Sequence, residues 1–89
     1  MLKFDWDERK NAENICKHEV SFDEAQSVWA DPLANEYYDP DHSDDEDRWI
    51  RIGYSFCRLL VVSFAEKNDT IRIISARQAT KKEIRAHEG

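Results

Sequence analysis

The sequence contains few of the residues that build tight backbone loops or cross-links. Its 89 residues include two glycines, two prolines and two cysteines. Two isolated glycines, Gly53 and Gly89, cannot form a phosphate-cradling loop or a dinucleotide-binding fingerprint. Cys16 and Cys57 have no CxxC spacing, which argues against a disulfide framework and a metal-ligand pair, and we expect both to be small packing residues. We therefore expect no cofactor and no metal site.

Long apolar runs are missing as well. The longest, Leu59–Val62, has four residues, whereas a membrane-spanning helix needs about 20. The first residues of the chain lack the apolar stretch and the small-residue cleavage site of a signal peptide. Unpaired thiols in a chain without an export signal predict a cytoplasmic protein with no membrane partner.

The composition nevertheless predicts a folded chain. Apolar residues make up 40% and charged residues 36% of the sequence, with three Trp, three Tyr and four Phe to fill a core. This composition is unlike that of a disordered chain. Because so short a chain can build only one core, we expect a single domain over residues 1–89.

Charge is divided unevenly along the chain. Residues 1–47 contain four basic and fifteen acidic side chains, whereas residues 48–89 contain nine basic and four acidic ones. Such asymmetry is typical of a protein with a nucleic-acid surface on one side, although charges that only keep the surface soluble give the same pattern.

The chain begins with a strand and a helix. Alternation of apolar and polar residues predicts a strand over residues 2–6. Asp7 is a good N-cap, and the segment 8–18 has helical composition. Its apolar residues recur at three- and four-residue steps and predict a narrow buried stripe. These residues are Ala12, Ile15 and Cys16.

A second helix is predicted over residues 22–29. Ser21 and Glu24 have the spacing of a capping box, in which hydroxyl and carboxylate each accept a hydrogen bond from a free backbone N–H. Pro32 excludes helical geometry at the preceding residue, so the helix should end near Asp31.

The segment 39–47 is strongly acidic, since six of its nine residues are Asp or Glu. Neighbouring carboxylates repel one another and cannot be buried, so we expect an exposed loop. The segment does not fit a calcium loop, because Asp44 stands where the turn needs Gly and Ile50 stands where a bidentate Glu is required.

The rest of the chain predicts a meander of strands and a final helix. Besides a short strand at 35–38, the β-branched and alternating patterns indicate strands at 50–56, 59–64 and 70–77. Thr80 and Glu83 form another capping box and begin the last helix. The fold class is therefore α+β, with the order β-α-α-β-β-β-β-α and an antiparallel sheet packed against helices.

The basic half supplies candidates for RNA chemistry. RNA can be cut without a metal ion if one group removes the 2′-OH proton, a second protonates the leaving 5′-oxygen, and a cation holds the extra phosphate charge. Arg suits the last task because its planar fork binds phosphate and stays charged. The acid and base candidates are His18, His87, Glu83 and, last in rank, His42. The same basic surface would equally serve nucleic-acid binding or an acidic partner.

Ser63 and Ser75 lie inside predicted strands, which argues against a serine hydrolase.

Six segments in register resemble the BrnT toxin family. They are Phe4-x-Trp6-Asp7; Lys17-His18-x-Val20-Ser21-Phe22-x-Glu24-Ala25; Asp31-Pro32-Leu33; Asp39-Pro40-Asp41-His42-Ser43; Arg48-x-Ile50-x-Ile52-Gly53; and Arg72-Ile73-Ile74-Ser75-Ala76-Arg77-x-Ala79-Thr80-x-x-Glu83. Each segment alone is weak evidence, but the six together span the chain and make a specific match.

The resemblance implies a RelE-like fold and a metal-independent endoribonuclease that arrests growth by cutting RNA. It also implies a partner, a BrnA-like antitoxin with a ribbon-helix-helix domain, which neutralises the toxin. The complex would bind operator DNA only through the antitoxin and repress its own operon. Because a ribbon-helix-helix domain is an obligate dimer, we expect a heterotetramer of two toxins and two antitoxins.

The resemblance also suggests site residues. We assign phosphate contact and transition-state charge to Arg72 and Arg77, a general-base role to Glu83 and a general-acid role to His87. The capping-box position of Glu83 also gives it a structural role. For RNA binding we select four further residues, namely Arg48, Arg51, Lys81 and Lys82.

Two residues depart from the family pattern. Glu19 stands where similar sequences have Gly after Lys-His, which affects how the first helix ends. His87 stands where they commonly have Tyr, and either side chain can donate a proton. His18, at the end of the first helix, has the position of a structural partner of the helix dipole.

Two other functions remain open from the sequence. The chain could be a catalytically weak module that binds the antitoxin and acts mainly in operon autoregulation. A DNA-binding antitoxin is a poorer interpretation, because no ribbon-helix-helix pattern opens the chain.

Overall fold

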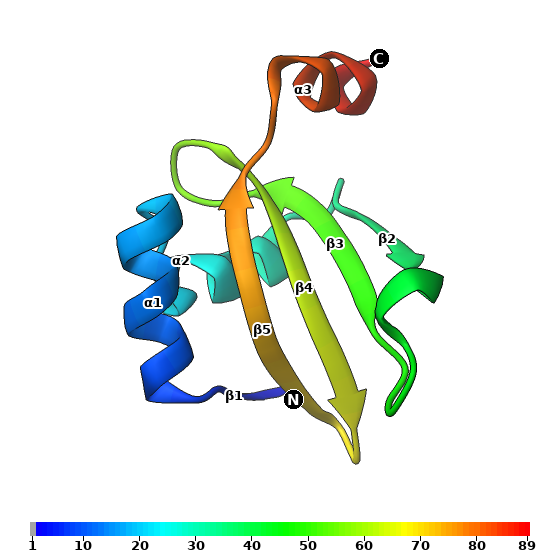
Figure 1. The fold of residues 1–89 in the computed structure, drawn as a ribbon. Coiled ribbons are helices and arrows are strands. Elements are labelled where there is room, and N and C mark those ends of the chain that lie inside the picture. Colours follow the sequence, from blue (N-terminus) through cyan, green and yellow to red (C-terminus); the bar gives the residue numbers. More distant parts are fainter. Residues whose placement is uncertain (1) are drawn as a thin grey trace.

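The computed structural model describes residues 2–89, in which five strands form one sheet in the order β1-β5-β4-β3-β2 (Figure 1). The strands are β1 (Lys3–Asp5), β2 (Asn35–Tyr38), β3 (Trp49–Tyr54), β4 (Leu59–Lys67) and β5 (Thr70–Gln78). The helices are α1 (Glu8–His18), α2 (Phe22–Gln26) and α3 (Lys81–Glu88), with 3₁₀ turns η1 (Ser27–Ala30) and η2 (Pro40–His42). The predicted α+β class is confirmed, and the order of elements differs from the prediction by the two 3₁₀ turns.

The sheet is mixed, so the expected antiparallel arrangement is wrong at one edge. Strands β2 to β5 form an antiparallel meander, but β1 pairs in parallel with β5, with Phe4 opposite Ile71. The difference arises because β1 joins the sheet beside the last strand rather than through a hairpin. Short strands of this kind protect a sheet edge from further pairing.

A tight hairpin joins β4 to β5. Its two loop residues, Asn68 and Asp69, have φ angles of 53° and 65°. Positive φ at both central residues is the geometry of a type I′ turn, and Asn and Asp tolerate it better than most other residues. Lys67 and Thr70 pair on either side of the loop. The turn fixes the register of the two longest strands.

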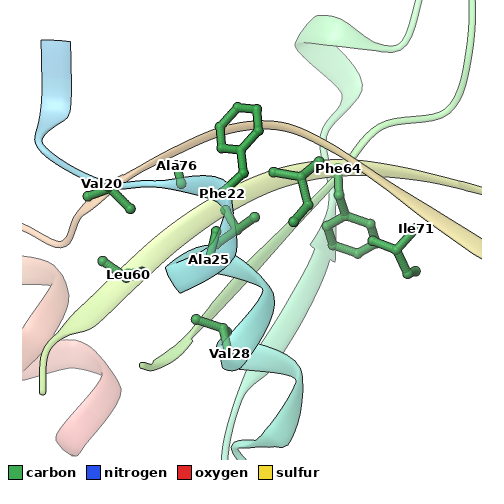
Figure 2. Packing of buried hydrophobic residues seen from close by; sticks show 10 residues of the cluster. Val20, Phe22, Ala25, Val28, Leu60, Phe64, Ile71 and Ala76 are labelled. Atoms are coloured by element: carbon green, nitrogen blue, oxygen red, sulfur yellow. The ribbon is translucent and has the colours of Figure 1, made fainter. Parts of the chain in front are cut away.

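The core lies between one face of the sheet and the segment from Val20 to Ala30. Val20, Phe22, Ala25 and Val28 pack against apolar side chains of β4 and β5, as the close view shows (Figure 2). Trp29 lies edge-on to Phe64, with ring centroids 4.9 Å apart. We call this the closed face of the sheet.

Helix α1 packs differently from the prediction. The expected buried stripe is wrong, because Ile15 is 44% exposed and Cys16 is exposed. The buried residue is instead Asn14, whose Nδ2 donates to the carbonyls of Val20 (2.8 Å) and Ala76 (2.7 Å) and whose Oδ1 accepts from the Ala76 N–H (3.1 Å). Among residues 2–89, no strand pairs with this edge of β5 beyond Arg72, and the Asn14 amide hydrogen-bonds to Ala76 where a neighbouring strand would otherwise do so.

The end of α1 keeps the geometry that Gly would favour. Glu19 adopts a left-handed conformation with φ 57°, and its N–H donates to the Ile15 carbonyl at 2.9 Å. The Arg58 guanidinium donates to the Glu19 carbonyl at 2.8 Å. Glu19 therefore takes the left-handed conformation that commonly ends a helix, at the energetic cost of a non-glycine residue there.

The second helix is shorter than predicted. Regular α-helix ends at Gln26 and continues as the 3₁₀ turn η1. Ser21 caps the helix by accepting from the Glu24 N–H at 3.0 Å. The reciprocal half of the expected capping box is absent in the described structure, because the Glu24 carboxylate binds Arg58 and Ser55 instead.

A β-bulge in β5 separates two sets of side chains. Ser63 pairs with Ser75, but Phe64 pairs with Ile73, so Ile74 is an extra residue in β5. Before the bulge, Ile73 packs in the core, and after it Ala76 does so. Arg77 consequently lies on the opposite side of the sheet, which we call the open face. Bulges commonly re-aim side chains in this way.

Helix α3 covers one end of the open face. Its capping box is formed as predicted, with the Thr80 hydroxyl and Glu83 carboxylate both accepting backbone N–H groups. Ile84 packs against a small cluster of Ile52, Leu59 and Val61. The helix lies at the end of the sheet away from the β4–β5 hairpin (Figure 1). Within residues 2–89, no helix has the length and apolarity needed to span a membrane.

Candidate functional site

Two adjoining hollows, each of about 260 Å³, lie on the open face. The first, which we call the histidine hollow, is lined by His18, His42, Arg48 and Arg77 among others. The second, the tyrosine hollow, is lined by Asn35, Tyr37, Glu83 and His87 among others. Ile50, Val61 and Arg77 line both. Arg77 therefore stands where the two hollows meet.

Arg77 is held in a fixed orientation by Glu83. Its Nη1 and Nη2 donate to the two carboxylate oxygens of Glu83 at 2.8 and 3.0 Å. The paired carboxylate raises the pKa of the guanidinium. The Arg77 side chain is still 42% exposed. The result is a positioned cation that remains open to a ligand.

The same contacts define the state of Glu83. Arg77 and the Thr80 N–H, which donates at 2.8 Å, lower the pKa of the Glu83 carboxyl to about 2. A carboxylate of this kind is a weak proton acceptor at neutral pH, whereas a general base works best with a pKa near the working pH. The geometry therefore gives Glu83 the task of positioning Arg77.

Arg48 is a second cation of the histidine hollow. Its Nε is buried and has no hydrogen-bond partner among residues 2–89. The nearest carboxylate, that of Glu46, is 4.0 Å away. Buried polar groups in proteins are nearly always paired, and this unpaired donor lies at a hollow that it shares with Arg77.

Two histidines lie at the same hollow. His18 is the last residue of α1, the expected place for a partner of the helix dipole, and it is exposed. His42 lies at the end of η2, where its Nδ1 is 3.0 Å from Oδ2 of Asp39. A carboxylate at one ring nitrogen fixes the orientation of the imidazole and leaves the other nitrogen to face the hollow or solvent.

His87 lies in the tyrosine hollow, apart from the other two histidines. Its Nδ1 is 3.3 Å from Nδ2 of Asn35, and its ring centroid lies 6.0 Å from that of Tyr54. The structure thus brings His87 together with Arg77 and Glu83 along one hollow.

The structure does not bring Arg51 or Arg72 to these hollows. Arg51 lies on the closed side, where its Nε donates to the Val28 carbonyl and its guanidinium lies 5.2 Å from the centroid of the Trp29 ring. Arg72 pairs with Asp5 at 3.2 Å and lines a separate hollow near the β4–β5 hairpin.

The two lysines predicted to bind RNA belong to the helix that lies at the tyrosine hollow. Lys81 and Lys82 are exposed in the first turn of α3, two residues or fewer from Glu83. Neither lysine lines the histidine hollow or the tyrosine hollow. Arg58, which was among the basic residues of this half, binds Glu24 and links the β3–β4 turn to α2.

Sequence reasoning missed three contributors to this region. Asn14 holds the backbone at Ala76, next to Arg77. It was missed because the prediction for this helix placed only apolar residues on the buried side. Asp39 pairs with His42 across the short η2 turn, and the Asp-x-x-His spacing is the signal that could have found this pair. Tyr37 extends the open face from the edge strand. In the part of the chain described, no group of three His, Cys, Asp or Glu side chains has the arrangement of a metal site.

Comparison with known families gives the broader assignment. A family model described as ribonuclease toxin, BrnT, of type II toxin-antitoxin system matches residues 6–83. A comparison with curated proteins finds no match. The matched segment includes Arg48, Arg77 and Glu83 but ends before His87. Since it covers most of the 89 residues, this chain belongs to the BrnT family of ribonuclease toxins of type II toxin–antitoxin systems.

Proposed function

We propose that this toxin is an endoribonuclease that cuts RNA at the histidine hollow without a metal ion. The 2′-oxygen of the RNA bonds to phosphorus, and the bond between phosphorus and the 5′-oxygen breaks. The products are a 2′,3′-cyclic phosphate and a free 5′-hydroxyl. The observation that carries the proposal is that two arginines and two histidines line one hollow.

Arg77 and Arg48 hold the scissile phosphate. Arg77 is already oriented by Glu83, so it loses little freedom when phosphate binds, and Arg48 offers the donor that lacks a protein partner. Fixed cations of this kind stabilise the charge that develops on phosphate in the transition state. Arg72, Lys81 and Lys82 lie farther along the surface and contact the RNA strand away from the cut.

His18 and His42 divide the proton transfers. Imidazole both accepts and donates protons near neutral pH, so one ring removes the 2′-OH proton and the other protonates the 5′-oxygen. Asp39 holds His42 in place. His87, which shares a hollow with Arg77, is an alternative donor of the one proton that the 5′-oxygen takes up.

The partner follows from family membership. A type II system pairs its toxin with a protein antitoxin, and we propose a BrnA-like ribbon-helix-helix protein in a complex of two toxins and two antitoxins. This complex binds operator DNA only through the antitoxin and represses its own operon in the cytoplasm. A RelE-like arrangement of the strands is part of the same proposal.

The test compares two arginines of one strand. Purified wild-type protein, Arg77→Ala and Arg72→Ala are incubated with single-stranded RNA, with and without a chelator. We expect Arg77→Ala to slow cleavage by at least about 100-fold. Arg72→Ala should slow it by less than about fivefold, the scale of one exposed charge pair. Chelator should leave all rates unchanged.

The same variants are then expressed in cells without the antitoxin, and new RNA ends are mapped by primer extension. Growth arrest and new ends that vanish in Arg77→Ala support the proposal. Cleavage that stops on chelation overturns the metal-free mechanism. A folded wild-type protein that leaves growth and RNA intact would instead support an antitoxin-binding module that acts in autoregulation.

A further inference from the structure

The tyrosine hollow combines an apolar floor with an exposed aromatic wall. Ile52 and Val61 are buried at its base. Tyr37 lies on the edge strand β2 and is 48% exposed. A large aromatic ring that remains half exposed beside an apolar hollow offers a flat surface to a ligand.

Strand register fixes the direction of the Tyr37 side chain. Tyr37 pairs with Ile50 and Asn35 pairs with Ile52, so both residues of β2 share the open face with these isoleucines. Asn35 adds an amide, which can donate and accept hydrogen bonds. Tyr38 points to the opposite face, where it packs on Trp49 and donates to Asp47.

Arg77 connects this hollow to the proposed cleavage site. Because its side chain lines both hollows, a phosphate bound at Arg77 places one of its flanking nucleotides over the tyrosine hollow. A nucleobase has two apolar faces and a polar edge. These features match an aromatic wall, an apolar floor and an amide at the rim.

We propose that the tyrosine hollow is a nucleobase subsite, in which Tyr37 stacks on an unpaired base next to the scissile phosphate and Asn35 contacts the edge of that base. The proposal rests on the ribonuclease function stated above. Because a base in a duplex is stacked on its neighbours, the subsite selects single-stranded RNA.

The test measures kcat/KM on short single-stranded RNAs that contain one cleavable phosphate. The other phosphates are blocked by 2′-deoxy sugars, and matched substrates lack the base on the 5′ or the 3′ side of the cut. Tyr37→Leu should lower kcat/KM about tenfold on the intact RNA, since it removes a stacking ring. It should change kcat/KM little on one of the two abasic substrates. Tyr37→Phe should retain most of the wild-type value.

Tyr38→Leu is the matched control, because Tyr38 is the next residue of β2, is 44% exposed and faces away from the hollow. It should leave kcat/KM unchanged. An equal loss for Tyr37→Leu on the intact and both abasic substrates overturns the subsite, as does no loss at all.

A binding measurement keeps the subsite separate from the cleavage mechanism. The probe is a non-cleavable trinucleotide with 2′-deoxy sugars, titrated into wild type and variants. We expect Tyr37→Leu to weaken binding about tenfold for the intact probe, and to have little effect for a probe that lacks the base. Loss of this base-dependent difference overturns the subsite even if RNA is cut. Conversely, base-dependent binding without RNA cleavage overturns only the ribonuclease mechanism.

Discussion

The two faces of the sheet are built by the same strands and yet differ in almost every property. The closed face contacts the segment from Val20 to Ala30 through large apolar side chains, such as Phe22 and Phe64. The open face is covered at one end by α3 and leaves Arg48 and Arg77 partly exposed to solvent at the histidine hollow. The closed face holds the larger apolar core, whereas the open face holds the arginines and histidines of the proposed cleavage site. Substitutions on each face should therefore have separable effects.

The largest effect is expected on the closed face. Phe64→Ala removes a buried ring that packs edge-on to Trp29 and leaves a cavity. We expect the free energy of unfolding to fall by about 3–5 kcal/mol, measured by urea denaturation. Phe56→Ala is the control, since Phe56 is 83% exposed in the β3–β4 turn and should cost about 0.5 kcal/mol or less. Equal losses would contradict the placement of the main core on this face.

Asn14→Ala is expected to lower both stability and RNA cleavage, although Asn14 lies on the closed side of the sheet. Asn14 is the buried residue of α1, on the closed side of the sheet, and it holds the backbone of Ala76, next to Arg77. Its loss leaves buried backbone groups unpaired, so we expect about 3 kcal/mol lower stability, and slower RNA cleavage even where the variant is fully folded. Cys16→Ala, an exposed change on the same helix, should affect neither measurement. Normal cleavage by folded Asn14→Ala would show that Ala76 does not position the site.

Glu83→Gln tests the Arg77–Glu83 pair on the open face, through the pH dependence of the free energy of unfolding. The folded-state pKa of Glu83 is about 2, below its ordinary value of 4.5, so the charged carboxylate favours folding. This contribution is complete above about pH 4.5 and is lost as the pH falls toward 2. We expect the variant to be about 1–2 kcal/mol less stable at pH 7, after solvent screening.

The unfolding free energies of wild type and Glu83→Gln should then converge as the pH falls from 5 toward 2. Glu13→Gln, an exposed change in α1, should give no such pH-dependent difference. A constant difference between wild type and Glu83→Gln across this range would contradict the Arg77–Glu83 pairing.

The smallest effect is expected at a residue outside both faces. Glu19→Gly relieves a left-handed conformation at φ 57°, so it should stabilise the protein by about 0.5–1 kcal/mol and leave cleavage unchanged. The gain should appear as a higher urea midpoint. Glu19→Ala keeps the Cβ atom and should not give this gain, which separates the backbone effect from the loss of the carboxylate.

Features that depend on neighbouring residues in the sequence were predictable. The Thr80–Glu83 capping box and the Asp7 cap are local, and each is present in the structure. Local patterns also predicted the order of the strands and α-helices and therefore the α+β class. The pairing of β1 with β5 was not predictable in this way, because it joins residues almost 70 positions apart.

The candidate site was only partly predictable for the same reason. Arg77 and Glu83 are six residues apart, and a short segment suffices to bring them together. The histidine hollow instead joins the end of α1, the η2 turn and the middle of three strands. Whether Arg51 or Arg48 faces that hollow depends on strand register, which the arginines themselves do not reveal.

The bulge at Ile74 determines which side chains of β5 lie on each face of the sheet. Up to Ile73, the odd-numbered residues of β5 face the core, and beyond the bulge the even-numbered residues do. A single strand therefore contributes both Ile73 to the core and Arg77 to the hollow. Without the bulge, the side chains would alternate without interruption from Ile73 onward, so that Arg77 would point toward the core and Ala76 toward the open face. The extra residue at Ile74 therefore places Ile73 and Arg77, which an uninterrupted strand would put on one face, on opposite faces of the sheet.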